Sequence, residues 1–336
     1  MKYPACLLLL LLCWGSAGRA QPVSRLGAPA PRLRVIVDND FSGDPDGLFA
    51  LAHLLLSPSV EVRGIIGSHL KPGDGFDPSA TQADNAARKA TELLRVMHRL
   101  EVPVLAGSNV GMATDSTPVQ SAGVRLLLEE ARRPDPRPLY VLCGAGLTEI
   151  ASAALTDPSI ANRLTLVWIG GPEYPELALP PPGYSPLEYN LAIDVAAARA
   201  VFNRTHLPLW QVPRDAYRQV LLPHSVLQTR VQPRGALGRY LATTLESLLG
   251  RLRQYGLNTG ETYILGDSPL VLLTALQSSF EPDPSSSEYA LRPAPRLTFQ
   301  GTYAYNPAGH SIRVYRRIDT ELLLSDFLAK LELQAH

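Results

Sequence analysis

The chain reads Asp38-Asn39-Asp40-Phe41-Ser42-Gly43-Asp44-Pro45-Asp46 at the point where one apolar segment gives way to another. The first segment, 33–37, is rich in Val and Ile and predicts a β-strand, whereas the second, 47–56, has the length of a helix. Gly and Pro between them indicate a turn. Four carboxylates therefore follow a buried strand, at the edge where open α/β sheets bind their ligands. We expect a ligand site there.

Charge repulsion within this turn predicts what the ligand is. Carboxylates this close repel one another unless a cation or a donor-rich ligand offsets them. Asp38 and Asp40 share one face of an extended strand, and the turn brings Asp44 and Asp46 back toward it. A hard divalent cation such as calcium, which accepts carboxylate and carbonyl oxygens, is the expected occupant. The alternative is a solvated acidic turn in which Asp46 stabilises the start of a helix.

Strand-like and helix-like segments alternate along the rest of the chain. The strands are expected at 60–67, 102–107, 139–143, 164–171, 207–212, 297–303 and 311–315. The helices are expected at 81–99, 121–132, 195–202, 237–256 and 320–334, with one more ending near Leu155. Because most strands are nearly continuous in apolar residues, we predict an α/β fold with a mostly parallel central sheet and helices on both faces. The last two strands are expected as antiparallel additions.

The N-terminus is expected to lie outside this fold. Residues 1–20 combine a basic start, an apolar stretch and small residues near Ala20, which is typical of a secretory signal and too short for a membrane span. Residues 21–31 are rich in Pro and Ala and predict a flexible lead-in. We therefore expect an exported, periplasmic protein with one domain over 32–336 and no membrane span.

The charge balance argues against a nucleic-acid-binding protein, and the cysteine content excludes an internal disulfide. Removal of Lys2 and Arg19 from the 31 basic residues leaves 29 against 31 acidic ones, and this near-neutral balance argues against a nucleic-acid partner. Cys6 and Cys13 leave with the signal, so Cys143 would be the only cysteine. An internal disulfide is then excluded despite an oxidising destination.

Two further segments could complete a metal site at the same sheet edge. The turn after the strand at 139–143 would expose the backbone carbonyls of Cys143 and Gly144, and Asp267 precedes an apolar helix. Each has a simpler interpretation. Asp267 could cap that helix, and the Cys143 side chain could be a small buried apolar group.

Glu188 and Asn190 form a second polar group, after a Pro-rich loop at 172–186 that resembles a lid. A carboxylate and an amide on alternate positions suit hydrogen bonding to neighbouring sugar hydroxyls. The alternative is a solvated loop in which Asp194 caps the next helix. His69 follows the second strand and would face the same edge, although a loop histidine is the simpler interpretation.

Taken in order, these segments resemble the inosine/uridine-preferring nucleoside hydrolases over nearly the whole chain. That family has an acidic turn after its first strand, then Val-Pro-Val-x-x-Gly, Gly-Pro-Leu-Thr-Asn, Met-Gly-Gly, Glu-Phe-Asn-x-x-x-Asp and His-Asp-Pro segments. The matching stretches here are 38–46, 102–107, 144–149, 169–171, 188–194 and 266–269. No single match is decisive, but six in the same order are highly specific.

The resemblance implies calcium-dependent hydrolysis of the N-glycosidic bond of a small ribosyl compound. Calcium would be bound by Asp40, Asp46, Asp267 and a backbone carbonyl at Cys143 or Gly144. Asp40 would also act as general base. The ribose would be bound by the remaining candidates, which are Asp44, His69, Glu188 and Asn190. Family members are often dimers or tetramers, so a homo-oligomer is compatible with the resemblance.

The chain departs from the family pattern at three places. Pro45 replaces the second acid of the family's Asp-Asp pair, so that either Asp44 or Asp46 supplies the metal ligand. The segment 67–71 lacks the family's sugar-binding Asn, for which His69 could substitute. Gly266 stands where purine/pyrimidine-preferring members have the His that protonates the leaving group. Another group must then protonate the leaving group, or the leaving group must be one that departs without being protonated.

Two other functions compete with hydrolysis. An exported binding protein for a ribosylated ligand would use the same residues without turnover. A haloacid-dehalogenase-type phosphatase would use an Asp-x-Asp sequence such as Asp38–Asp40, but it also needs a suitably placed lysine. After residue 20 the chain has only Lys71, Lys89 and Lys330, none of them at a suitable position.

Overall fold

The computed structural model describes residues 30–278, 280–281 and 285–335 of the chain. The predicted signal at 1–20 and most of the predicted lead-in at 21–31 lie outside these residues, so export remains a prediction. Within the described ranges, none of the helices is both long enough and apolar enough to cross a membrane.

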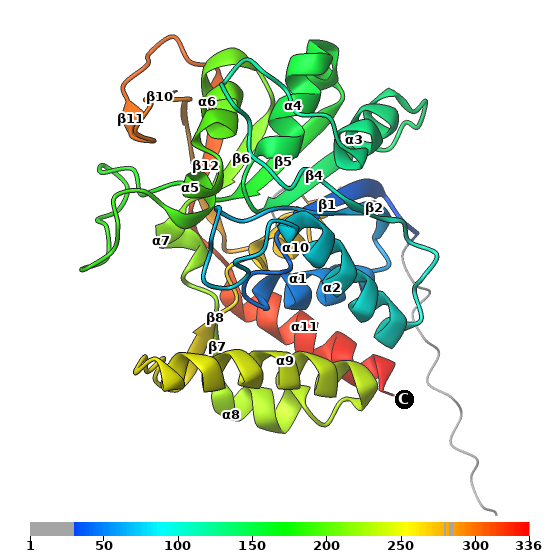
Figure 1. Ribbon diagram of the computed structural model, residues 1–336. Helices are drawn as coiled ribbons and strands as arrows, with labels where there is room; N and C mark the ends of the chain where they lie inside the picture. The colour runs from blue at the N-terminus through cyan, green and yellow to red at the C-terminus, as the bar shows by residue number, and fades with distance from the viewer. Residues whose placement is uncertain (1–29, 279, 282–284, 336) are drawn as a thin grey trace, which may run out of the picture.

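A central sheet of eight strands organises the fold (Figure 1). Its order is β3-β2-β1-β4-β5-β6-β12-β9, and every neighbouring pair is parallel except β12 with β9. The strands span β1 Leu33–Asn39, β2 Val60–Gly67, β3 Val104–Ala106, β4 Leu139–Gly144, β5 Leu164–Ile169, β6 Leu209–Val212, β9 Glu288–Pro293 and β12 Ser311–Arg317.

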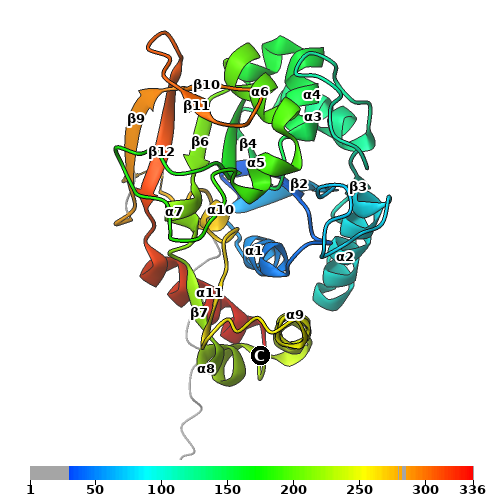
Figure 2. The same ribbon diagram turned by 60° about the vertical axis from the view of Figure 1, so that its left-hand side comes forward.

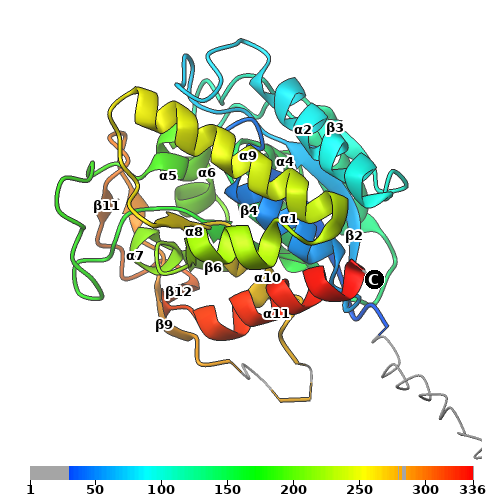
Figure 3. The same ribbon diagram turned by 90° about the horizontal axis from the view of Figure 1, so that it is seen from below.

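Helices cover both faces of the sheet, which confirms the predicted α/β class (Figures 1 and 2). One face carries α1 Asp46–Leu55, α2 Gln82–Met97, α10 Pro269–Leu272 and α11 Thr320–Gln334, with α9 Gly235–Gln254 packed outside them (Figure 3). The other face carries α3 Ala122–Arg132, α4 Thr148–Thr156 and α6 Val195–Arg204. Short helices connect these layers: α5 Tyr189–Ile193, α7 Arg214–Tyr217, α8 His224–Val226, η1 Pro158–Asn162 and η2 Leu227–Val231.

The apolar pattern of β1 explains how the two layers form. All seven residues of this strand are buried. Val35 and Val37 belong to the core beneath α1 and α2, whereas Ile36 belongs to the core beneath α3 and α4. Full burial of such a side chain contributes about 1.5–3 kcal/mol. A continuous apolar strand is therefore stable only with helices on both sides.

The C-terminal part of the sheet differs from the prediction. The segment 297–303 is not a strand of the sheet, because it folds into a small hairpin of β10 Arg296–Leu297 and β11 Tyr303–Ala304 around Gly301, whose φ is 74°. β12 pairs parallel with β6, and the antiparallel addition is β9. A separate two-stranded antiparallel sheet, β7 Leu221–Pro223 with β8 Thr262–Ile264, was not predicted either.

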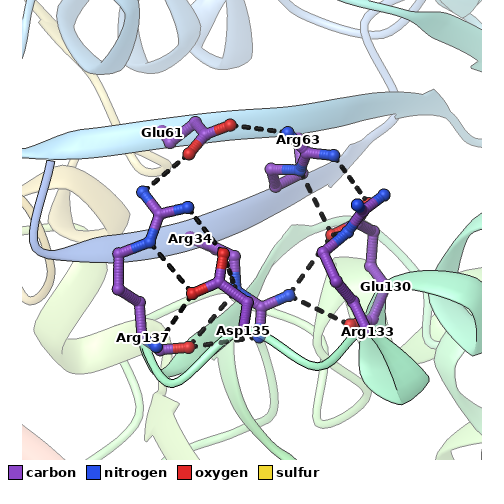
Figure 4. Close-up of polar contacts among 7 residues, drawn as sticks. All are labelled: Arg34, Glu61, Arg63, Glu130, Arg133, Asp135 and Arg137. Carbon is purple, nitrogen blue, oxygen red and sulfur yellow. Dashed lines mark hydrogen bonds and ion pairs between the residues drawn. The ribbon is translucent and has the colours of Figure 1, made fainter.

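An ion-pair network closes the amino-terminal edge of the sheet (Figure 4). It joins four arginines and three acids: Arg34, Arg63, Arg133, Arg137, Glu61, Glu130 and Asp135. Arg34 and Glu130, each 3% exposed, are its buried centre. The Arg34 guanidinium donates to Glu130 Oε2 at 3.3 Å and to the Arg137 carbonyl at 3.1 Å. The network ties β1 and β2 to α3 and the loop before β4.

Candidate active site

The carboxyl ends of β1, β4, β5 and β6 meet at one edge of the sheet. The register places Asn39 beside Gly144, Cys143 beside Trp168, and Ile169 beside Val212. Each strand is followed by a loop, so this edge collects side chains from distant parts of the sequence. A cavity of about 160 Å³ opens there, lined by Asp40, Asp44, Asp46, Gly144, Ile169, Glu188, Tyr189, Asn190, Tyr217, Gly266 and Asp267.

Four aspartates line this cavity, and hydrogen bonds to the carboxylates of three of them fix their positions. Asn39 Nδ2 donates to Asp267 Oδ2 at 2.7 Å, and the Asp267 backbone N–H donates to Asp46 Oδ2 at 3.0 Å. The Tyr263 hydroxyl donates to Asp44 Oδ2 at 2.7 Å. Asp40, which follows β1, has its carbonyl bonded by the Gly43 N–H at 2.7 Å, so it lies within the turn. Asn39 and Asp267, which are hydrogen-bonded, are thus 228 positions apart in the sequence.

Burial and mutual repulsion disfavour the ionised form of these acids. Burial, then the charges of Asp267 and Asp44, raise the pKa of the Asp40 carboxyl well above its usual range. The pKa of Asp46 is raised by burial and by the same two neighbours. Burial also raises the pKa of Asp267, although the hydrogen bond from Asn39 opposes the shift. A cation among them would favour the ionised forms instead.

The lining fits a hard cation in its chemistry. Five of the described residues around the cavity are carboxylates, and none is Lys, Arg or His. Calcium prefers such a set of oxygen ligands, whereas softer metals prefer nitrogen or sulfur ligands. In the described part of the chain, however, no three Asp, Glu, His or Cys side chains are already arranged as a metal-binding group. The acids line one cavity, but several of their carboxylate oxygens accept hydrogen bonds from protein groups instead of converging on one point.

Glu188 and Asn190 line the same cavity. Glu188 precedes α5 and accepts from the Leu191 N–H at 2.9 Å, the Gly171 N–H at 2.8 Å and the Tyr217 hydroxyl at 2.9 Å. Asn190 Nδ2 donates to the Ile169 carbonyl at 2.8 Å, at the end of β5. These bonds set a carboxylate and an amide in fixed positions in the same lining as the aspartates.

The structure brings Gly144 into the cavity lining but not the side chain of Cys143. The Cys143 thiol is fully buried in the core and donates toward the Gly146 carbonyl at 3.4 Å. Burial raises its pKa, so a thiolate ligand is disfavoured. A Cβ at position 144 would overlap the side chains of Asn39 and Asp267, which explains why a glycine ends β4.

Two polar side chains expected at this edge lie away from the cavity. His69 is 2% exposed, and its ring nitrogens contact the Leu70 carbonyl at 2.8 Å and Thr148 Oγ1 at 2.9 Å. Asp38 is fully buried and accepts from the Ser68 hydroxyl. The expected common face of positions 38 and 40 fails because β1 ends at Asn39, so strand alternation does not extend to Asp40.

Asp194 caps a helix, as the alternative interpretation of its segment expected. Its Oδ1 accepts from the Ala197 N–H at 2.9 Å and caps α6. Its Oδ2 accepts from Thr148 Oγ1 and from the Met112 N–H, both at 2.7 Å. It therefore joins three elements behind the cavity and does not line it.

Sequence reasoning missed three residues that support the site: Asn39, Tyr217 and Tyr263. Asn39 lies inside the acidic turn and could have been considered as a hydrogen-bond donor to an acid. Tyr217 follows β6, so its position near the common edge could have been predicted from the parallel sheet. Tyr263 lies in β8, a three-residue strand that has no clear sequence pattern, and no signal identified it.

Comparison with known proteins identifies the family and the fold of the chain. A sequence model of the inosine-uridine preferring nucleoside hydrolases matches residues 35–290. No curated protein sequence matches the chain. Among solved structures, it is similar to a plant nucleoside hydrolase, with a TM-score of 0.68, 18% identity, and coverage of 90% of this chain and 99% of that one.

Two bacterial structures give the same result. A purine-preferring ribonucleoside hydrolase from Gardnerella vaginalis has a TM-score of 0.67 at 18% identity, with coverage of 90% of this chain and 99% of that one. An inosine-uridine preferring nucleoside hydrolase from Bacillus anthracis has a TM-score of 0.62 at 14% identity, with coverage of 90% and 100%. At these identities the likeness establishes the fold, and the sequence match over most of the chain establishes the family. The chain belongs to the inosine-uridine preferring nucleoside hydrolases, a family of N-glycosyl hydrolases.

Proposed function

We propose that the cavity binds calcium and the ribose of a nucleoside or related ribosyl compound, and that water hydrolyses the N-ribosidic bond there. The observation that carries the proposal is the lining itself, in which five carboxylates and an amide face one space without a basic side chain among the described residues. Asp40, Asp46, Asp267 and a backbone carbonyl of Cys143 or Gly144 are the proposed metal ligands. When bound, calcium would offset their repulsion and lower the pKa of a water molecule.

The remaining roles follow from the chemistry of the side chains. Asp40 accepts the proton of the attacking water as general base. Glu188 is fixed by three donors, and its negative charge stabilises the positive charge that develops on the ribose in an oxocarbenium-like transition state. Asn190 and Asp44 bind sugar hydroxyls. His69 is left out of the ribose site because both of its ring nitrogens have protein partners.

No observation favours the phosphatase alternative. None of the described residues lining the cavity is a lysine. Lys71 lies closest in sequence to the acidic turn, but its ammonium group is paired with Asp74 Oδ2 at 3.8 Å and stacks on the ring of Tyr189, so that it adjoins the cavity without lining it.

Removal of calcium is the first test of this function. We expect the purified protein to release ribose from at least one member of a panel of purine, pyrimidine and pyridine ribosides. Dialysis against a chelator should lower the rate by about 100-fold or more, because the metal supplies several kcal/mol of charge stabilisation. Added calcium should restore it.

The same assay separates the hydrolase from a binding protein. Tight calcium-dependent binding of a riboside without release of ribose would contradict the hydrolase function and support the binding alternative. A rate that chelation leaves unchanged would contradict the metal requirement alone.

A further inference from the structure

A second cavity, of about 440 Å³, opens directly beside the candidate active site. The two cavities share four lining residues, which are Asp44, Asp46, Tyr217 and Gly266. A ligand whose ribose lies among the aspartates would therefore extend its other part into the second space. We call this second space the outer cavity.

Gly266 keeps the passage between the two cavities open. A Cβ at this position would lie 3.2 Å from Asp46 Oδ2 and 3.3 Å from Cδ2 of Tyr217, and both of these residues line both cavities. Any longer side chain would project into the space between the acid and the ring. The glycine thus both removes a proton donor and makes room for part of the ligand.

The outer cavity is suited to a flat group. Three tyrosines, Tyr184, Tyr217 and Tyr263, contribute aromatic surface to its wall. Two of their hydroxyl protons are already committed, since Tyr217 donates to Glu188 at 2.9 Å and Tyr263 donates to Asp44 at 2.7 Å. Neither is free to protonate a departing base, and no histidine lies among the described residues around either cavity.

One positive charge in the wall of the outer cavity, that of Arg218, has no acid within ion-pair distance among the described residues, although it acts at longer range on Glu173. The Arg218 guanidinium lies 4.5 Å from the centre of the Tyr184 ring, and its buried Nε has no hydrogen-bond partner. Among the described residues it forms no ion pair. Arg214, one helical turn earlier, shows the contrast, because its guanidinium donates twice to Glu173 at 2.6 Å. An unpaired guanidinium beside aromatic surface is a binding group for a planar carboxylate.

We propose that Arg218 binds a carboxylate on the leaving group of the substrate, and that this leaving group is a ring whose nitrogen departs without being protonated. This inference rests on the proposed ribosidase function. A pyridinium riboside whose ring carries a carboxylate meets both conditions. As the bond from C1′ to the ring nitrogen breaks, its electron pair neutralises the cationic nitrogen, so no acid is needed. Water adds its oxygen to C1′ and loses one proton, first to Asp40 and then to solvent.

Matched pyridine ribosides test the role of Arg218. Nicotinate riboside carries a carboxylate, nicotinamide riboside replaces it with a neutral amide of similar shape, and nicotinamide mononucleotide carries its negative charge on the 5′-phosphate instead. The wild type should prefer nicotinate riboside over nicotinamide riboside by about ten- to one-hundredfold in kcat/KM, the range of a hydrogen bond to a charged group. Arg218→Gln should abolish the preference, and Arg218→Lys should retain part of it. Arg125→Gln, at an exposed position on α3, is the control and should leave it unchanged.

Other outcomes would overturn the proposal in distinguishable ways. Equal rates for the two ribosides, or a preference that survives Arg218→Gln, would show that Arg218 does not select the leaving group. An Arg218-dependent preference for the mononucleotide would assign the arginine to a 5′-phosphate instead. Calorimetric binding of nicotinate itself to the wild type and to Arg218→Gln does not depend on turnover. Binding lost only in the variant, with no riboside hydrolysed, would refute the hydrolase function while retaining the anion site.

Discussion

Replacement of Asp40 by Asn is expected to lower kcat/KM for ribose release by about two to four orders of magnitude, the range for loss of general acid–base catalysis. The substitution keeps the shape of the side chain but removes the proposed base and one proposed metal ligand. It also removes a carboxylate that burial and the charges of Asp267 and Asp44 hold at a raised pKa. The metal-free variant should therefore be at least as stable as the metal-free wild type.

Steady-state kinetics and thermal unfolding together check this prediction. Glu246→Gln, at an exposed position on α9, is the matched control and should change neither quantity. A variant at position 40 that retained more than a tenth of the wild-type activity would exclude Asp40 as the base. A loss of activity accompanied by a large loss of stability would instead indicate a structural role.

The second large effect concerns stability at the opposite edge of the sheet. Glu130→Gln is expected to lower the free energy of unfolding by about 3–5 kcal/mol, because it leaves the buried Arg34 guanidinium without its main charge partner. Arg63 and Arg133, at 3.1 and 2.7 Å from Glu130 Oε1, lose the same acid. Denaturant unfolding at neutral pH measures the change. Glu332→Gln, which removes an exposed pair with Arg234, should cost less than about 1 kcal/mol.

The effect at Glu130 should also depend on pH. Burial alone would raise the pKa of this acid, but hydrogen bonds from Arg133 and Arg63 outweigh it and hold the pKa below the ordinary value of 4.5. The stabilisation is therefore complete above that value and is lost as the pH falls through the lower pKa of the folded protein. The difference between the wild type and Glu130→Gln should shrink below about pH 4. A difference that stayed constant down to pH 3 would show that the charge of Glu130 is not its source.

Much of the fold was predictable because buried parallel strands leave a clear pattern. β1, β4 and β5 are nearly continuous in apolar residues, and helix-like segments alternate with them along the chain. β9 was missed because it pairs only with β12 and its residues are partly or fully exposed, so it lacks that pattern. The segment 297–303 was misread as a strand because its apolar and Thr residues hide a turn at Gly301.

The acids of the site were predictable from position, whereas their supporting partners were not. Asp40, Asp44 and Asp46 follow β1 at the carboxyl edge of the parallel sheet, where ligand sites are expected. Asp267 lies outside that sheet, between β8 and α10, and its sequence position before an apolar helix was the signal for it. The hydroxyl of Tyr263 reaches Asp44 across 219 positions of sequence, and nothing local encodes that contact. His69 illustrates the converse error, because a position near the edge does not fix the direction of a side chain. Its neighbour Thr148 holds the ring inside the core.

A crystal structure of the protein soaked with calcium and ribose would test the central claim most directly. We expect one calcium ion bound by Asp40, Asp46, Asp267 and a carbonyl of Cys143 or Gly144, with oxygen distances of about 2.3–2.6 Å. The ribose hydroxyls should contact Glu188 and Asn190. Calcium elsewhere, or ribose outside the cavity that these residues line, would contradict the account.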